Sequence, residues 1–181
     1  MPARPRPAAA PHLWRGWGIL VAAAACHPGA ATPTTPGTGE VSGSVDGVTF
    51  DHVGSSWLAG QPDDPSTTVV YLSDADLPCD TLGSPGWDAR TADGSQVLEL
   101  KLIGTEPGEY PVQARPSAGQ STDNYTLTSA SPAETSATSG LVTLDGLEPE
   151  NGASGSFDLT FPTGSLAGSF STGWCATARE P

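Results

Sequence analysis

The amino-acid sequence predicts an all-β protein, an antiparallel β-sandwich or flattened barrel with long Ser/Thr-rich loops. The clearest support comes from Phe157, Leu159 and Phe161, which alternate with polar residues at the period of two that is typical of a half-buried strand. Glycine and proline supply 22 and 18 of the 181 residues without a Gly-X-Y repeat, which favours many tight turns. Beyond the N-terminal segment, no long stretch keeps the roughly 3.6-residue apolar period of an amphipathic helix.

The predicted sheet begins with a hairpin. Val41 to Val45 and Val48 to Phe50 are strand-like, and Asp46-Gly47 between them accepts the positive φ angles of a type I′ turn. Further strands are expected at residues 67–72, 87–91, 96–103, 124–128 and 141–144, with a second Asp-Gly turn at 93–94. Exposed loops rich in Ser, Thr, Ala and Pro are expected at 114–124 and 129–140.

The segment 96–103 has the clearest inside-outside pattern of the chain. Leu98, Leu100 and Leu102 alternate with Glu99 and Lys101. This alternation predicts a strand with one face in the core and the other in solvent.

A second hairpin is predicted near the end of the chain. Residues 155–161 and 166–175 form its strands, joined by a Pro-Thr-Gly-Ser turn. Trp174 and Cys175 would lie on opposite faces of an unbroken strand, so one of them would be exposed unless Gly173 marks a β-bulge. The bulge is the favoured interpretation.

The charge of the chain is strongly negative. All twenty acidic residues lie at or after Glu40, and the net charge is −13. Such a surface repels phosphate backbones, so nucleic acid is not expected as a partner. The acidity is expected to serve solubility.

The first 25 residues have the pattern of a secretory signal peptide, with early arginines, an apolar stretch from Trp17 to Ala25 and small alanines before Cys26. A helix over that stretch would cross only about half of a bilayer's hydrocarbon core, so a retained transmembrane anchor is not expected. Leu20 to Cys26 resembles the lipobox of bacterial lipoproteins, which implies that Cys26 is acylated, as by palmitate, and becomes the mature N-terminus. The alternative is ordinary cleavage after an Ala-x-Ala, with Cys26 incidental.

The three cysteines support the lipobox, because an exported chain with three has an odd thiol. If lipid modifies Cys26, Cys79 and Cys175 can form a disulfide in an oxidising compartment. Residues 26–39 contain Pro, Thr and Gly but no large apolar side chain, which predicts a tether. The β-sandwich domain is expected over 40–181.

The lipobox, the Pro/Thr tether, the Asp-Gly hairpin and the closing hairpin that ends in a cysteine together resemble uncharacterised envelope lipoproteins of Gram-negative bacteria. The resemblance implies a β-domain held at a membrane by N-terminal acyl groups. In that family an Asp after the lipidated cysteine often marks inner-membrane retention, so His27 implies the outer membrane, on its periplasmic or surface face. The resemblance implies no activity.

Few residues could support catalysis. His52 is the only histidine of the expected domain, which excludes a multi-histidine zinc site and makes His52 necessary for any Ser-His-Asp triad. Asp51 adjoins it, but neighbours in a strand point to opposite faces. The sequence has neither a Gly-x-Ser-x-Gly nor a His-Glu-x-x-His motif. We therefore assign no catalytic residue, no cofactor site and no metal site.

The function expected first is a non-enzymatic binding or structural module of the cell envelope. A hydrolase that uses His52 or a pair of carboxylates is an alternative. Another is a calcium-stabilised, adhesin-like domain with oxygen ligands from Asp63, Asp64, Asp74, Asp76 and Asp80. A third is a carbohydrate-binding domain with an aromatic platform built from Trp57, Trp87, Trp174, Tyr71, Tyr110 and Tyr125.

Overall fold

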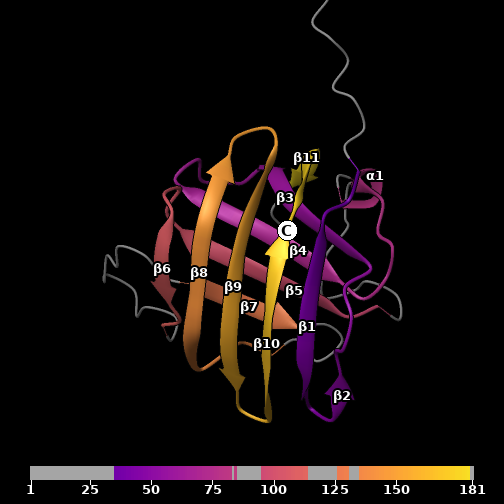
Figure 1. The fold of residues 1–181 in the computed structure, drawn as a ribbon, viewed down its shortest axis with the longest axis vertical. Coiled ribbons are helices and arrows are strands. Elements are labelled where there is room, and N and C mark those ends of the chain that lie inside the picture. Colours follow the sequence, from indigo (N-terminus) through magenta and orange to yellow (C-terminus); the bar gives the residue numbers. More distant parts are fainter. Residues whose placement is uncertain (1–34, 83, 85–94, 114–125, 131–134, 180–181) are drawn as a thin grey trace, which may run out of the picture. The chain divides into compact units, whose positions relative to one another are not determined.

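A computed structural model describes residues 35–82, 84, 95–113, 126–130 and 135–179. These residues form two β-sheets and one short helix, α1 (Cys79–Leu82) (Figure 1). The all-β prediction is confirmed, and the sheets of the described part form a sandwich rather than a closed barrel.

The larger sheet has six strands in the order β2-β1-β10-β9-β8-β6, all antiparallel to their neighbours. Its strands are β1 (Thr38–Val45), β2 (Val48–Thr49), β6 (Gly108–Pro111), β8 (Ser139–Glu148), β9 (Gly152–Phe161) and β10 (Gly164–Ser171). The predicted turn between β1 and β2 is present, with φ angles of 52° at Asp46 and 78° at Gly47. We call this the large sheet.

The smaller sheet has five strands in the order β11-β3-β4-β5-β7. Its strands are β3 (Ser55–Gln61), β4 (Thr67–Ser73), β5 (Val97–Ile103), β7 (Thr126–Ala130) and β11 (Gly173–Arg179). All pairs are antiparallel except β11 and β3, which run parallel. We call this the small sheet.

The main core lies between the two sheets, which Figure 1 shows one behind the other with their strands crossing obliquely. Leu98, Leu100 and Leu102 of β5 are fully buried in it, while Glu99 and Lys101 on the other face are partly exposed, as the alternation predicts. The large sheet contributes the alternate residues Phe157, Leu159 and Phe161 of β9. Burying these apolar side chains from both sheets is the main source of stability for the sandwich.

The other predicted strands are partly recovered. The segments 67–72, 124–128 and 141–144 fall largely within β4, β7 and β8, whereas β3 and β6 were not predicted. The expected loop 129–140 is wrong at both ends, since β7 and β8 extend into it. The expected strand 87–91, the turn 93–94 and the whole of the expected loop 114–124 lie outside the described residues.

The closing hairpin is correct only as far as Ser171. After Thr172, whose backbone N–H donates to the Ala153 carbonyl at 2.8 Å, the chain leaves the large sheet and pairs with β3 as β11. The predicted bulge at Gly173 is wrong, because the pairing with β3 stays in register from Gly173 to Cys175. Both faces of β11 are covered, so Trp174 packs against the main core while Cys175 is buried on the opposite face.

A second, smaller core covers the outer face of the small sheet. It consists of Trp57, Ala59, Val69, Tyr71, Leu82, Val97, Cys175 and Ala178. The segment that covers it is held by hydrogen bonds from the Ser55 hydroxyl to the Ala75 carbonyl at 2.9 Å and from the Trp57 indole to the Leu77 carbonyl at 2.8 Å. The predicted disulfide between Cys79 and Cys175 is present, with the two Cα atoms 5.5 Å apart. It links α1 to β11.

The first described strand lies near the expected start of the β-domain at residue 40. The first strand starts at Thr38, and Gly37 before it donates its N–H to the Ser56 carbonyl at 2.8 Å. The predicted signal peptide, Cys26 and most of the tether lie outside the described residues. No helix in the described part of the chain is long and apolar enough to cross a membrane.

Candidate functional site

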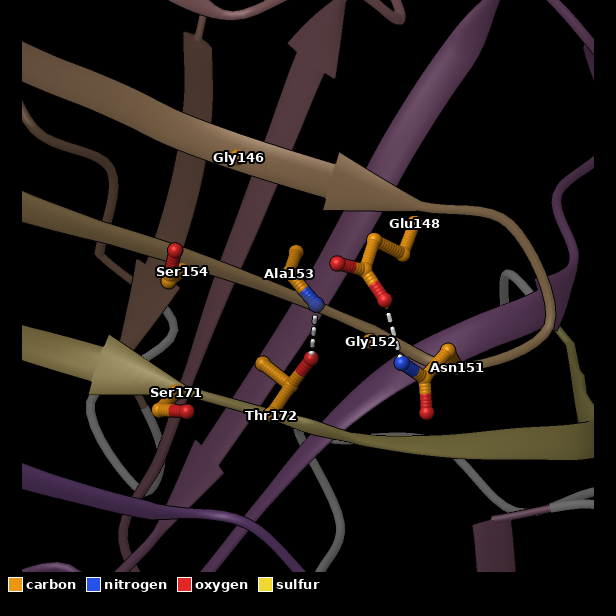
Figure 2. Close-up of a pocket in the computed structure, with 8 residues that line it drawn as sticks. All are labelled: Gly146, Glu148, Asn151, Gly152, Ala153, Ser154, Ser171 and Thr172. Carbon is orange, nitrogen blue, oxygen red and sulfur yellow. Dashed lines mark hydrogen bonds between the residues drawn. The ribbon is translucent and has the colours of Figure 1, made fainter.

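A polar cavity of about 340 Å³ opens where β8 turns into β9 and where the chain leaves β10 for β11 (Figure 2). The residues that line it have small or uncharged polar side chains, apart from the one carboxylate of Glu148. They are Gly146, Glu148, Asn151, Gly152, Ala153, Ser154, Ser171 and Thr172.

Two local structures shape this cavity. The turn from Glu148 to Asn151 is closed by a backbone hydrogen bond of 3.0 Å, and the Asn151 amide also donates to the Glu148 carboxylate. On the opposite side, the Thr172 hydroxyl accepts the Ala153 N–H at 2.8 Å (Figure 2). A side chain at Gly152 would come within 2.3 Å of the Thr172 carbonyl oxygen, so this close approach requires glycine.

The groups that remain in the cavity suit hydrogen bonding. Ser154 and Ser171 are directly opposite each other on β9 and β10, and their hydroxyls have no hydrogen-bond partner among the described residues. A hydroxyl both donates and accepts, and the Glu148 carboxylate accepts. The lining contains no histidine, cysteine or basic side chain among the described residues, so this arrangement can bind a polar ligand but offers no general base with a histidine's pKa.

His52 lies beside a second cavity of about 550 Å³ at the edge of β1. Its ring nitrogen Nδ1 is 2.9 Å from a carboxylate oxygen of Asp51, which contradicts the expectation that the two side chains point to opposite faces. The reason is that β2 ends at Thr49, so neither residue belongs to a strand. The hydrogen bond to Asp51, with a further contribution from Asp74, raises the pKa of His52 above its usual 6.5.

The catalytic triad that would need His52 is not assembled in the described residues. The His52 side chain is 66% exposed, and no described serine hydroxyl forms a hydrogen bond with it. A general base needs a nucleophile within hydrogen-bond reach. A hydrolase with a His52 triad therefore has no geometric support among the described residues, and a hydrolase with paired carboxylates stays an alternative.

The aspartates proposed for calcium do not converge. The described residues contain no group of three or more acidic, histidine or cysteine side chains that could hold a metal ion. Asp64 accepts hydrogen bonds from the backbone and hydroxyl of Ser66, which lower the pKa of its carboxyl. Asp74 accepts the backbone N–H of Gln96 at 2.8 Å. Asp64 thus closes a local turn, whereas Asp74 joins two segments that lie 22 residues apart in the sequence.

The aromatic platform is not formed by the residues proposed for it. Trp57, Tyr71 and Tyr110 are only 2%, 1% and 3% exposed, respectively. Trp174 is half-buried against the main core. The remaining two proposed residues, Trp87 and Tyr125, lie outside the described residues. Burial also raises the pKa of Tyr110, whose hydroxyl donates to the Glu106 carbonyl at 2.5 Å.

Comparison of this chain with protein-family models, with curated proteins and with solved structures finds no match.

The cavity in Figure 2 was not predicted from the sequence. A signal for it exists in Glu-Pro-Glu-Asn-Gly at 148–152, a sequence typical of a turn, in which Glu148 and Asn151 supply polar side chains.

Proposed function

We propose that this chain is an outer-membrane lipoprotein, exported and acylated at Cys26, whose β-sandwich is a non-enzymatic binding or structural module. The observation that carries the proposal is the disulfide between Cys79 and Cys175. It uses two of the three cysteines and leaves Cys26, within the lipobox-like stretch, as the odd one.

The compartment and the anchor agree with each other. Disulfides persist mainly in oxidising compartments outside the cytosol. Acyl chains bind a bilayer with about 0.8 kcal/mol for each buried methylene, and stable anchoring needs more than one chain. The tether would then separate the acidic domain from the membrane surface.

The role as a module rather than an enzyme rests on the side chains that the described residues bring together. His52 has a carboxylate partner but no hydrogen bond to a described serine or threonine hydroxyl, and the cavity in Figure 2 offers hydrogen-bonding groups. Such a surface recognises a polar partner without changing it.

The test is the intact mass of the full-length protein, isolated from membranes of a Gram-negative host, before and after reduction. We expect the mass of residues 26–181 plus acyl groups, and a gain of two hydrogen atoms on reduction. In a matched Cys26→Ala variant we expect loss of membrane association with the disulfide retained. An unacylated protein with the wild-type sequence would overturn the proposal.

A further inference from the structure

Three cavities adjoin one another on the outer face of the large sheet. The cavity of Figure 2 shares Ser171 with a cavity of about 390 Å³ between β1 and β10. That cavity shares Gly39 and Glu40 with the one beside His52. The shared residues place the three cavities in a row from the β8–β9 turn across β10 and β1 to His52, and we call this row the groove.

The strand register explains why the groove is lined by small polar groups. Thr38 is opposite Ser171 and Glu40 is opposite Ser169, and Ser171 is in turn opposite Ser154. Directly opposed residues point to the same face of a sheet, and neighbouring strands lie about 4.8 Å apart. The outer face therefore presents polar groups in rows, at a regular spacing across the strands.

Most of these polar groups are available to a ligand. The hydroxyls of Thr38, Ser154, Ser169 and Ser171 and the carboxylate of Glu40 have no partner within the part of the chain that the structure describes. Hydroxyls can both donate to and accept from the hydroxyls of a sugar. A carboxylate accepts from them in a stronger, charge-assisted bond.

The charge of the groove disfavours anionic ligands, and the rows of hydroxyls between its carboxylates favour a ligand that binds through hydroxyl groups. Glu148, Glu40 and Asp51 line it, His52 is its only described side chain that can be cationic, and the whole chain carries −13. An anionic polymer would be repelled. We propose that the groove binds a single neutral glycan strand; this inference rests on the proposed function as a binding module and names its ligand class.

The experiment is an NMR titration of the full-length chain carrying Cys26→Ser, which binds without any contribution from an acyl anchor. The probes are three hexasaccharides: neutral β-1,4-linked N-acetylglucosamine, its fully deacetylated cationic form, and anionic oligogalacturonate. We expect the neutral probe to shift the amide signals of Thr38, Ser169 and Ser171, and the anionic probe to shift none of them. No shift with the neutral probe at millimolar concentration, or shifts with the cationic probe alone, would overturn the proposal.

Two variants on the same sheet face locate the binding. Ser169→Trp fills the middle of the groove and should weaken binding of the neutral probe at least tenfold, or about 1.4 kcal/mol. Thr160→Trp is the control, since Thr160 is exposed on the same face but lines none of the three cavities. Equal loss in both variants would contradict binding in the groove. Since anchoring plays no part, this result is independent of whether Cys26 is acylated.

Discussion

The outer faces of the two sheets are built in opposite ways. The outer face of the small sheet is closed by a second apolar core, in which Trp57, Tyr71 and Cys175 are at most 2% exposed. The outer face of the large sheet is open, and exposed small polar residues such as Ser156 and Ser169 stand on it.

Because of this difference, one face is suited to stabilising the fold and the other is accessible to a ligand. Strands with two buried faces contribute twice to apolar burial, as in β4, where all seven residues are buried. A strand face of serine and threonine adds little packing, since these side chains bury little apolar area. The closed face is therefore expected to carry stability and the open face to carry recognition, and the following predictions test that division.

The largest effect is expected from the disulfide that holds the closed face. Replacing both Cys79 and Cys175 by alanine should lower the free energy of unfolding by about 4 kcal/mol, since a loop of nearly 100 residues is released in the unfolded state. Urea unfolding of the wild-type and double-variant proteins measures this. A loss below about 1 kcal/mol would show that the link is not needed to close this face.

The next effect is expected from the helix beneath that link. Leu82, which is 2% exposed, is the buried side chain of α1, and Leu82→Ala should cost about 3 kcal/mol because it leaves a cavity in the second core. Ser156→Ala on the open face is the control and should change the stability by no more than about 0.5 kcal/mol. Equal costs for the two variants would remove the contrast between the faces.

A smaller effect is expected at the edge of the large sheet, in the turn before β2. Gly47 has a φ of 78° and open space where a side chain would stand, so Gly47→Ala tests the backbone alone. We expect a loss of about 1 kcal/mol in unfolding free energy, from the cost of the left-handed conformation. An unchanged urea concentration at the midpoint of unfolding would show that the turn accommodates alanine without a conformational cost.

The smallest effect is expected from His52, at the end of the groove. Its pKa is raised above 6.5 by the hydrogen bond to Asp51, so the folded state favours the protonated ring. The resulting stabilisation is complete below about pH 6.5 and is lost as the pH rises through the raised pKa. NMR titration of the ring should give a midpoint that Asp51→Asn lowers. An equal titration midpoint in the wild-type protein and in Asp51→Asn would show that the hydrogen bond to Asp51 does not raise the pKa of His52.

Local signals in the sequence were sufficient where one face of a strand is buried. The alternation in β5 and β9 and the Asp-Gly turn at 46–47 predicted correct structure, because their patterns depend on neighbours in sequence. The segment Ser-Ser-Trp-Leu-Ala-Gly-Gln of β3 gave no such signal. Both of its faces are covered, one by the main core and one by the second core, so polar and apolar residues do not alternate.

The change of sheet at Thr172 and the groove could not be predicted because both depend on strand register. The sequence around Thr172 continues the pattern of β10, and only the pairing with β3 moves Trp174 and Cys175 into the small sheet. Similarly, Ser169 and Ser171 read individually as solvent-facing residues. That they align with Thr38 and Glu40 on the same face follows from pairing across more than a hundred residues.

The measurement that tests the division most directly is solvent accessibility of alanine methyl groups on the two outer faces. Ala59 and Ala178 lie in the second core and are 5% and 0% exposed, whereas Ala167 of β10 is partly exposed on the open face. With a neutral paramagnetic agent in solution, we predict strong broadening of the NMR signal of the Ala167 methyl group and little change for the other two. Equal broadening of all three methyl signals would contradict the burial of the small sheet's outer face. Protection of the Ala167 methyl group would contradict the exposure of the large sheet's outer face.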